Sequence, residues 1–226
     1  MVKAVIFDMF ETLITHYETP LYFSAQMAAD AGIEPEHFLP IWHATEQGRT
    51  IGKLTLEQVL ATILRENQRY SENLLKEIVE KRIETKRSCF RHMHPEIIPM
   101  LSQLKEKGIF IGLISNCFSE EAKAIRESEL FPYFDAVCLS WEQGIQKPDK
   151  EIFEKCTEML SVTEEECLYV GDGGSYELET AKELGMTAVQ AAWYLKEGLT
   201  QLSKRKPDFT QLETPLDVLR YLLKEK

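Results

Sequence analysis

The sequence lacks any apolar run long enough to cross a bilayer. Its N-terminal hydrophobic stretch, Val2–Phe7, is far shorter than the ~20 apolar residues that a membrane-spanning helix needs. No small-residue cleavage site of a secretory leader follows it. The sequence therefore predicts a cytoplasmic protein with no membrane partner.

Cysteines are few and show no paired spacing. There are five, an odd number, and no C-x-x-C spacing occurs. The odd count argues against a disulfide framework, and the missing spacing argues against a structural zinc site. Reduced thiols in a cytosol fit this pattern best. The cysteines are Cys89, Cys117, Cys138, Cys156 and Cys167.

Basic residues are also in short supply. The chain has 26 Lys and Arg against 37 Asp and Glu, which gives a formal net charge of −11. Proteins that bind nucleic acids or anionic membranes need a basic face, so we expect no nucleic-acid partner. The remaining composition, 44% hydrophobic in 226 residues, is ordinary for a globular protein with one core and a modest insertion.

Five short apolar runs, each followed by a polar or glycine-containing turn, predict buried strands. They are hydrophobic almost throughout rather than in alternation, which is what a parallel sheet covered on both faces requires. The runs are Val2–Phe7, Ile109–Ile114, Ala136–Leu139, Cys167–Val170 and Thr187–Ala191.

Helical segments alternate with the later strands. The first begins around Pro95 and ends at Gly108, with proline at its start and glycine past its end. Others are expected from Ser119, over 149–160 and over 176–184. Alternation of strand and helix from residue 95 to 192 predicts a doubly wound, Rossmann-like α/β fold.

The first two predicted strands do not follow this regular alternation of strand and helix. About thirty residues suffice for a βαβ unit, yet roughly a hundred separate the two runs, and the intervening sequence is helical throughout. Helices are expected over 20–31, 36–47, from the capping box at Thr55, and over 71–87. We predict an α/β core of residues 1–14 and 91–226, with a four-helix cap of residues 15–90.

Acidic side chains follow two of the predicted strands. Asp8 ends the first strand, Asp172 ends the fourth, and Glu177 falls in the first turn of the next helix. In open α/β sheets ligands bind beyond the carboxyl ends of the strands, so these groups should converge. Three carboxylates in one crevice repel one another unless a cation joins them, and their oxygen atoms suit Mg²⁺. The sequence therefore predicts a magnesium site.

Donors for an anionic ligand stand at the same edge. Ser115 and Asn116 end the second strand, and Lys147 precedes Pro148 in a loop between the third and fourth. Together with free backbone N–H groups in the turns, these residues could hold a dianionic group against an ionised carboxylate.

The ordered set of motifs resembles the haloacid dehalogenase-like superfamily, in its phosphatase-like branch with a helical cap after the first strand. The resemblance covers essentially the whole chain. Its motifs are Asp8-x-x-x-Thr12, Ser115, Lys147-Pro148 and Gly171-Asp172-x-x-x-x-Glu177.

This resemblance implies a reaction and a metal site. Asp8 would attack phosphorus to give an aspartyl-phosphate that water then hydrolyses. Mg²⁺ would be held by Asp8, by the backbone carbonyl of Phe10 and by Asp172, with Glu177 assisting. The expected substrate is a small phosphorylated molecule.

It also implies roles for the neighbouring residues. Ser115 and Lys147 would bind phosphate oxygens, and Thr12 would orient the nucleophile loop. Asn116 is a further candidate for substrate binding. Arg49, in the predicted cap, is a weaker candidate for reaching the substrate.

One position departs from the phosphatase pattern. Phosphatases of this family usually carry a second aspartate two residues after the nucleophile, as general acid and base, and this chain has Phe10 there. Phenylalanine transfers no proton, so three interpretations stay open. A cap residue or Glu11 substitutes for the aspartate. The substrate has a good leaving group, as in an acyl phosphate or a phosphonate with an electron sink. Or the chain is a metal-independent haloacid dehalogenase, for which Arg49 is the nearest cap arginine. An impaired, phosphate-binding member without turnover is a further alternative.

Overall fold

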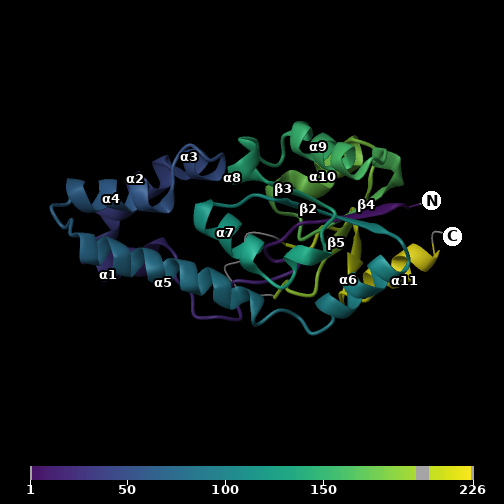
Figure 1. Cartoon of the computed structure of the whole chain (residues 1–226), viewed down its shortest axis with the longest axis horizontal. Helices are drawn as coiled ribbons and strands as arrows, with labels where there is room; N and C mark the ends of the chain where they lie inside the picture. The colour runs from purple at the N-terminus through teal and green to yellow at the C-terminus, as the bar shows by residue number, and fades with distance from the viewer. Residues whose placement is uncertain (1, 197–203, 225–226) are drawn as a thin grey trace.

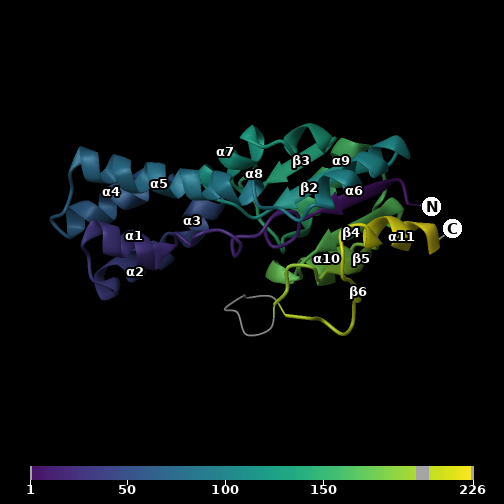
Figure 2. The ribbon, with the colours of Figure 1, turned by 90° about the horizontal axis from the view of Figure 1, so that it is seen from below.

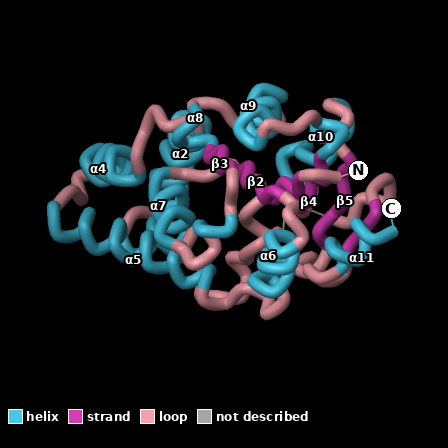
Figure 3. The backbone as a smooth tube through the Cα atoms, turned by 45° about the vertical axis from the view of Figure 1, so that its right-hand side comes forward, coloured by secondary structure: helices cyan, strands magenta, loops and turns pink. Residues whose placement is uncertain are grey.

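The computed structural model describes residues 2–196 and 204–224, and these contain one parallel six-stranded sheet in the order β3-β2-β1-β4-β5-β6. Helices cover both of its faces (Figures 1 and 3). The predicted doubly wound α/β class is confirmed. The strands are β1 (Ala4–Phe7), β2 (Phe110–Ser115), β3 (Ala136–Leu139), β4 (Cys167–Gly171), β5 (Thr187–Ala191) and β6 (Thr210–Leu212).

Alternate residues of each central strand enter two separate cores. In β1, Val5 and Phe7 pack on one face of the sheet, and Ala4 and Ile6 pack on the other. Because both faces are covered, every residue of this strand is buried, which explains why the strand sequences are hydrophobic without alternation. The covering helices are α6 (Ile97–Glu106), α7 (Ser119–Glu127) and α11 (Asp217–Lys224) on the first face, and α9 (Lys150–Leu160) and α10 (Glu177–Glu183) on the second.

The C-terminal part of the chain adds two elements that the sequence patterns did not predict. Strand β6 pairs in parallel with β5 at the edge of the sheet, and α11 packs its Val218 and Leu219 into the core. A short helix, α8 (Ser140–Gln143), also follows β3 directly. Among the described residues, no helix is both long and apolar enough to span a membrane.

The chain between β1 and β2 is a helical insertion. It extends away from the sheet in Figure 1 and in the perpendicular view of Figure 2, and it has an apolar cluster of its own. The segment predicted as one helix over 36–47 is two helices, so the insertion holds five helices rather than four. They are α1 (Ser24–Ala31), α2 (Pro35–Ala44), α3 (Glu46–Thr50), α4 (Leu56–Glu66) and α5 (Glu72–Phe90).

Local sequence signals explain where these helices begin and end. Gly32 adopts the left-handed conformation that closes α1, with φ of 63°. Thr55 and Gln58 form the predicted capping box, because the Thr55 hydroxyl accepts from the Gln58 N–H and the Gln58 side chain accepts from the Thr55 N–H. At its far end α5 returns to the α/β core, where Cys89 and Phe90 join the main apolar cluster.

The strand order reverses at β1, which lies between β2 and β4. After β3 the chain crosses to the other side of β1 and continues with β4. Such a switch point opens a crevice beyond the carboxyl ends of the two strands concerned. Those ends carry Asp8 and Asp172.

Candidate active site

Three carboxylates meet at the switch point. Asp8 follows β1 and is tied to the neighbouring strand by its backbone N–H, which donates to the carbonyl of Val170 at 3.0 Å. Asp172 follows β4, and its carboxylate accepts from the N–H of Gly174 at 2.9 Å. Asp8, Asp172 and Glu177 are all buried, and each offers one oxygen within 4.8 Å of the others. The predicted convergence of the three carboxylates is therefore found.

Glu177 reaches the site because the strand before it ends in glycine. A Cβ atom on Gly171 would lie 2.1 Å from Oε1 of Glu177, so only glycine leaves room for the carboxylate. Oε1 accepts from the N–H of Gly173 at 3.1 Å. Oε2 accepts from the hydroxyl of Tyr169 at 3.0 Å. The Glu177 carboxylate is thus fixed from two sides.

Lys147 brings a positively charged side chain into the site. Its Nζ donates to Asp8 Oδ1 at 2.5 Å and to Glu177 Oε2 at 2.5 Å. The Asn116 side chain aligns it, because its amide nitrogen donates to the Lys147 carbonyl at 2.9 Å and its oxygen accepts from the Lys147 N–H at 2.8 Å. Asn116 therefore holds the lysine loop, and since it also lines both cavities described below, its contact with substrate stays a prediction.

Burial and like charge shape the proton affinities of this cluster. Burial raises the pKa of Asp8 to about 7, with Lys147 opposing the rise and Glu177 adding to it. Burial also raises the pKa of Glu177, and Lys147 only partly offsets this. Burial alone would lower the pKa of Lys147, but the two carboxylates outweigh it and raise that pKa. Three buried carboxylates facing one lysine leave excess negative charge, which a bound cation would neutralise.

The donor set fits a hard divalent cation. All of the side-chain ligands are carboxylate oxygens, and Mg²⁺ is held in proteins by a few such oxygens together with water and substrate phosphate. Histidine and cysteine are absent from this cluster. The residues that could hold magnesium are Asp8, Asp172 and Glu177, and the backbone carbonyl of Phe10 is added only by the family resemblance.

Two predicted hydroxyl groups are buried beside the site. Ser115 and Thr12 are fully buried, and neither hydroxyl has a hydrogen-bond partner among residues 2–196 and 204–224. A buried hydroxyl without a partner is costly, and a bound ligand oxygen would relieve that cost. Trp193 donates to the backbone carbonyl of Thr12 at 2.7 Å, a contact that the sequence patterns did not predict.

Two cavities lie at this edge of the sheet, and neither is lined by Ser115 or Thr12. The smaller, about 330 Å³, is lined by Asp8, Asp172 and Glu177 among others. The larger, about 690 Å³, lies between the core and helices α2 and α3 of the insertion. The cavities share five lining residues, which are Phe10, His16, Asn116, Lys147 and Ser175. A molecule with its reacting group at Asp8 can therefore extend toward the insertion.

Phe10 faces the junction of the two cavities without any group that transfers a proton. Its ring stacks on that of His16, with the ring centroids 4.7 Å apart. The carboxylate of Glu11, a suggested substitute for the missing aspartate, accepts from the Thr15 hydroxyl at 2.5 Å and from the backbone N–H of His16 at 3.0 Å. Glu11 is thus engaged within its own loop.

Arg49 is not brought to the site. Its side chain is buried, with the guanidinium 3.6 Å from the ring centre of Trp42 and 4.1 Å from that of Phe118, and it lines neither cavity. Burial lowers its pKa to about 10. The expectation that Arg49 contacts the substrate is not supported by this placement, because the two aromatic rings cover the group.

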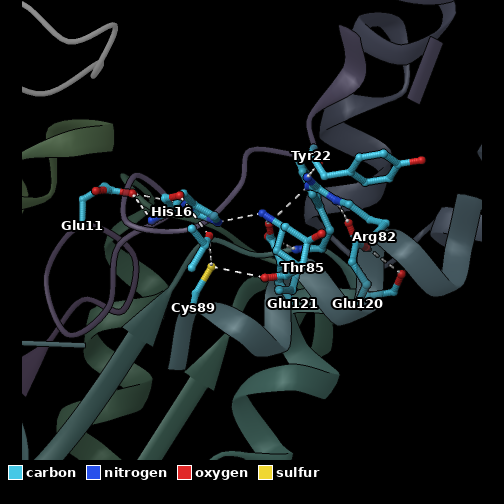
Figure 4. A network of polar contacts seen from close by, with 12 residues as sticks. Glu11, His16, Tyr22, Arg82, Thr85, Cys89, Glu120 and Glu121 are labelled. Carbon is cyan, nitrogen blue, oxygen red and sulfur yellow. Dashed lines mark hydrogen bonds and ion pairs between the residues drawn. The ribbon is translucent and has the colours of Figure 1, made fainter. Parts of the chain in front are cut away.

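A buried charged network lies where the insertion meets the core (Figure 4). Arg82 and Lys86 of α5 pair with Glu120 and Glu121 of α7, and Lys86 also contacts His16. The sequence patterns did not single out this network. Its one local signal is two basic residues, four apart, on the face of α5 that turns toward the core.

The fold and the site define an α/β protein with a doubly wound parallel sheet and a cluster of carboxylates at the carboxyl ends of its strands. A family model described as haloacid dehalogenase-like hydrolase matches residues 2–185, and the chain belongs to that family. A glyceraldehyde 3-phosphate phosphatase of Methanopyrus kandleri is 32% identical over 142 residues. That alignment covers 58% of each chain, so this chain spans under two thirds of that relative.

Solved structures with the same fold come from both chemical branches of the family. A 2-haloacid dehalogenase from Pseudomonas syringae has a TM-score of 0.68 at 21% identity, with 100% of both chains covered. An enzyme from Bacteroides thetaiotaomicron, solved with magnesium and inorganic phosphate, has a TM-score of 0.63 at 19% identity and covers 89% of this chain and 98% of that one. At these identities the likeness establishes the fold alone.

Proposed function

We propose that the protein is a magnesium-dependent phosphohydrolase that forms an aspartyl-phosphate at Asp8. The observation that carries the proposal is the meeting of Asp8, Asp172 and Glu177 oxygens within 4.8 Å of one another beside Lys147. A dehalogenase forms its ester without a metal, so it has no use for three converging carboxylates. The phosphatase name of the Methanopyrus kandleri relative supports the same reaction class.

In this proposal each side chain has a defined task. An oxygen of Asp8 attacks phosphorus, the bond from phosphorus to the leaving oxygen breaks, and water then releases phosphate and regenerates the carboxylate. Lys147 holds a phosphoryl oxygen and orients Asp8, and Ser115 donates its unpartnered hydroxyl to a second phosphoryl oxygen. Magnesium bound by the carboxylates supplies charge neutralisation to the phosphoryl group.

The helical insertion serves as a cap in the same proposal. The leaving group lies in the larger cavity, below residues of α2 and α3, where closure against the core excludes water. Phe10 supplies no proton, so turnover depends steeply on how well the leaving oxygen departs unaided. Residues 15–90 as a separate cap domain, a small phosphorylated substrate and a cytoplasmic location remain predictions.

A panel of small phosphates tests this function. Phosphate release is measured with Mg²⁺ and with a chelator, for the wild type and for Asp8→Asn, starting with glyceraldehyde 3-phosphate and acetyl phosphate. We expect turnover that requires Mg²⁺ and disappears in Asp8→Asn. Turnover by Asp8→Asn at the wild-type rate would refute the covalent scheme.

The second candidate is a haloacid dehalogenase, and two observations favour it. First, the Phe10 side chain cannot donate a proton, and a halide leaving group needs none. Second, the Pseudomonas syringae dehalogenase shares the whole fold. Halide release from 2-chloropropionate that is unaffected by a chelator would establish this reaction. We expect no halide release, because the carboxylate cluster would hold excess negative charge beside the substrate carboxylate.

A further inference from the structure

We infer that Lys86 is a positioning residue, which ties helix α5 of the insertion to the nucleophile loop (residues 8–16) through His16 and Glu11. Its effect falls on the placement of Asp8 and of the Phe10 backbone. The inference rests on the proposed function, since it assigns a role in the same site. Figure 4 labels Glu11, His16 and Glu121. Lys86 connects His16 with Glu121, and the contact between Lys86 and His16 joins residues 70 apart.

At the nucleophile loop, this series of contacts ends at a residue with a strained backbone, Glu11. Glu11 has a φ of 61°, a left-handed conformation that residues other than glycine seldom adopt. Its carboxylate receives the Thr15 hydroxyl, the His16 N–H and, at 3.1 Å, Nδ1 of the His16 ring. These bonds close the loop over residues 11–16, directly after Asp8 and Phe10. Without them the loop would relax away from the strained conformation.

His16 joins the loop to the insertion. Nδ1 of its ring lies against Glu11, and Nε2 accepts from Nζ of Lys86 at 2.6 Å. The ring also stacks on Phe10 and lines both cavities. A displacement of the His16 ring would therefore be passed to Phe10 and to the wall of the site.

At the insertion, the series of contacts ends at Lys86, which is held by ion pairs with helix α7. Lys86 is 1% exposed, and its Nζ lies 2.6 Å from Oε1 of Glu121 on α7. Arg82, one turn earlier on α5, lies 3.2 Å from Glu120 and 3.5 Å from Glu121. Separating a buried charge from its partner is strongly destabilising, because the charge is left without compensation. Lys86 therefore has little freedom to leave its position.

The two basic residues offer a natural comparison. Arg82 and Lys86 lie on the same helix, are both buried and pair with adjacent glutamates. Among the described contacts of these two residues, those with the nucleophile loop belong to Lys86, which meets His16 and lies over the Phe10 ring. If the network merely attaches the insertion to the core, removing either base should have the same consequences. If Lys86 positions the loop, its removal should also disturb the metal site.

The experiment compares Lys86→Met with Arg82→Met in the full chain. Mg²⁺ binding is measured by titration calorimetry without substrate, and thermal stability and kcat are measured alongside. We expect similar losses of Tm in the two variants. Mg²⁺ affinity and kcat should fall at least tenfold in Lys86→Met and less than twofold in Arg82→Met. Equal effects of the two variants on Mg²⁺ binding would overturn the inference.

The loop side gives an independent test, which holds if Lys86→Met does not fold. Glu11→Ala should weaken Mg²⁺ binding to a similar degree, and Glu11→Gln, which keeps an acceptor for Thr15 and His16, should restore most of it. A Glu11→Ala variant with wild-type Mg²⁺ affinity would refute the inference. Because these binding measurements need no turnover, their outcome is separate from failure of the proposed reaction.

Discussion

Gly171 is the position where the smallest change should do the most damage to the site. In Gly171→Ala the new methyl group would lie 2.1 Å from Oε1 and 2.7 Å from Cδ of Glu177. Ordinary contacts of a Cβ begin at 3.4 Å, so the carboxylate must retreat by about 1 Å. The bonds from Lys147 at 2.5 Å and from Tyr169 at 3.0 Å do not survive such a shift. A misplacement of this size costs ~10²-fold in rate.

The assay is kcat and Mg²⁺ dependence on an activated phosphate, with Gly112→Ala as the matched control. Gly112 lies in β2, and its added methyl group would meet Cys156 at 2.9 Å and Ile6 at 3.1 Å, within the apolar core. Overpacking there should cost ~1–3 kcal/mol of stability and leave the Mg²⁺ dependence unchanged. A Gly171→Ala enzyme with wild-type kcat and Mg²⁺ dependence would show that Glu177 does not serve the reaction.

Three further predictions concern Phe10, Arg49 and Glu121. Phe10→Asp should speed hydrolysis of alkyl phosphates, toward the ~10²–10⁴-fold that general acid catalysis supplies, and change acetyl phosphate turnover little; an equal change for both leaving groups would contradict this. Arg49→Met should keep or raise the free energy of unfolding. Nε and Nη1 of Arg49 are buried and have no hydrogen-bond partner in the described part of the chain, and such groups cost ~1–3 kcal/mol each. A raised KM at unchanged Tm would instead place Arg49 at the substrate. Burial would raise the pKa of Glu121, but Lys86 and Arg82 lower it to about 2, below its ordinary 4.5. Its contribution is therefore complete above pH 4.5 and is lost as the pH falls toward 2. The free energy of unfolding, measured at a series of pH values, should be higher for wild type than for Glu121→Gln above pH 4.5, and this difference should shrink as the pH falls toward 2. A difference that does not change with pH would refute the assignment.

The elements that the sequence predicted well are those whose signal is local. The central strands are buried on both faces, so Val5 and Ile6 must both be apolar, and a continuous run results. The carboxylates lie at strand ends, and parallel strands bring their ends to one edge whatever their separation in the chain. Asp8 and Asp172 could therefore be placed together from their positions alone.

The features that the sequence did not predict depend on contacts between distant segments. The contact between His16 and Lys86 joins residues 70 apart, and no local sequence pattern around either residue predicts it. Arg49 could be placed on a cap helix but not oriented, and its guanidinium turned out to lie between Trp42 and Phe118. Strand β6 has only three residues and lies at the sheet edge, where no long apolar run is needed.

The most direct test of the account is to trap the covalent intermediate. The protein is mixed with Mg²⁺ and a radiolabelled acyl phosphate, quenched in acid within one turnover, digested and mapped by mass spectrometry. We predict a phosphoryl group on the peptide that carries Asp8, and none when Asp8 is replaced by asparagine. Release of phosphate by the wild type with the label absent from Asp8, or present on another side chain, would contradict the central claim.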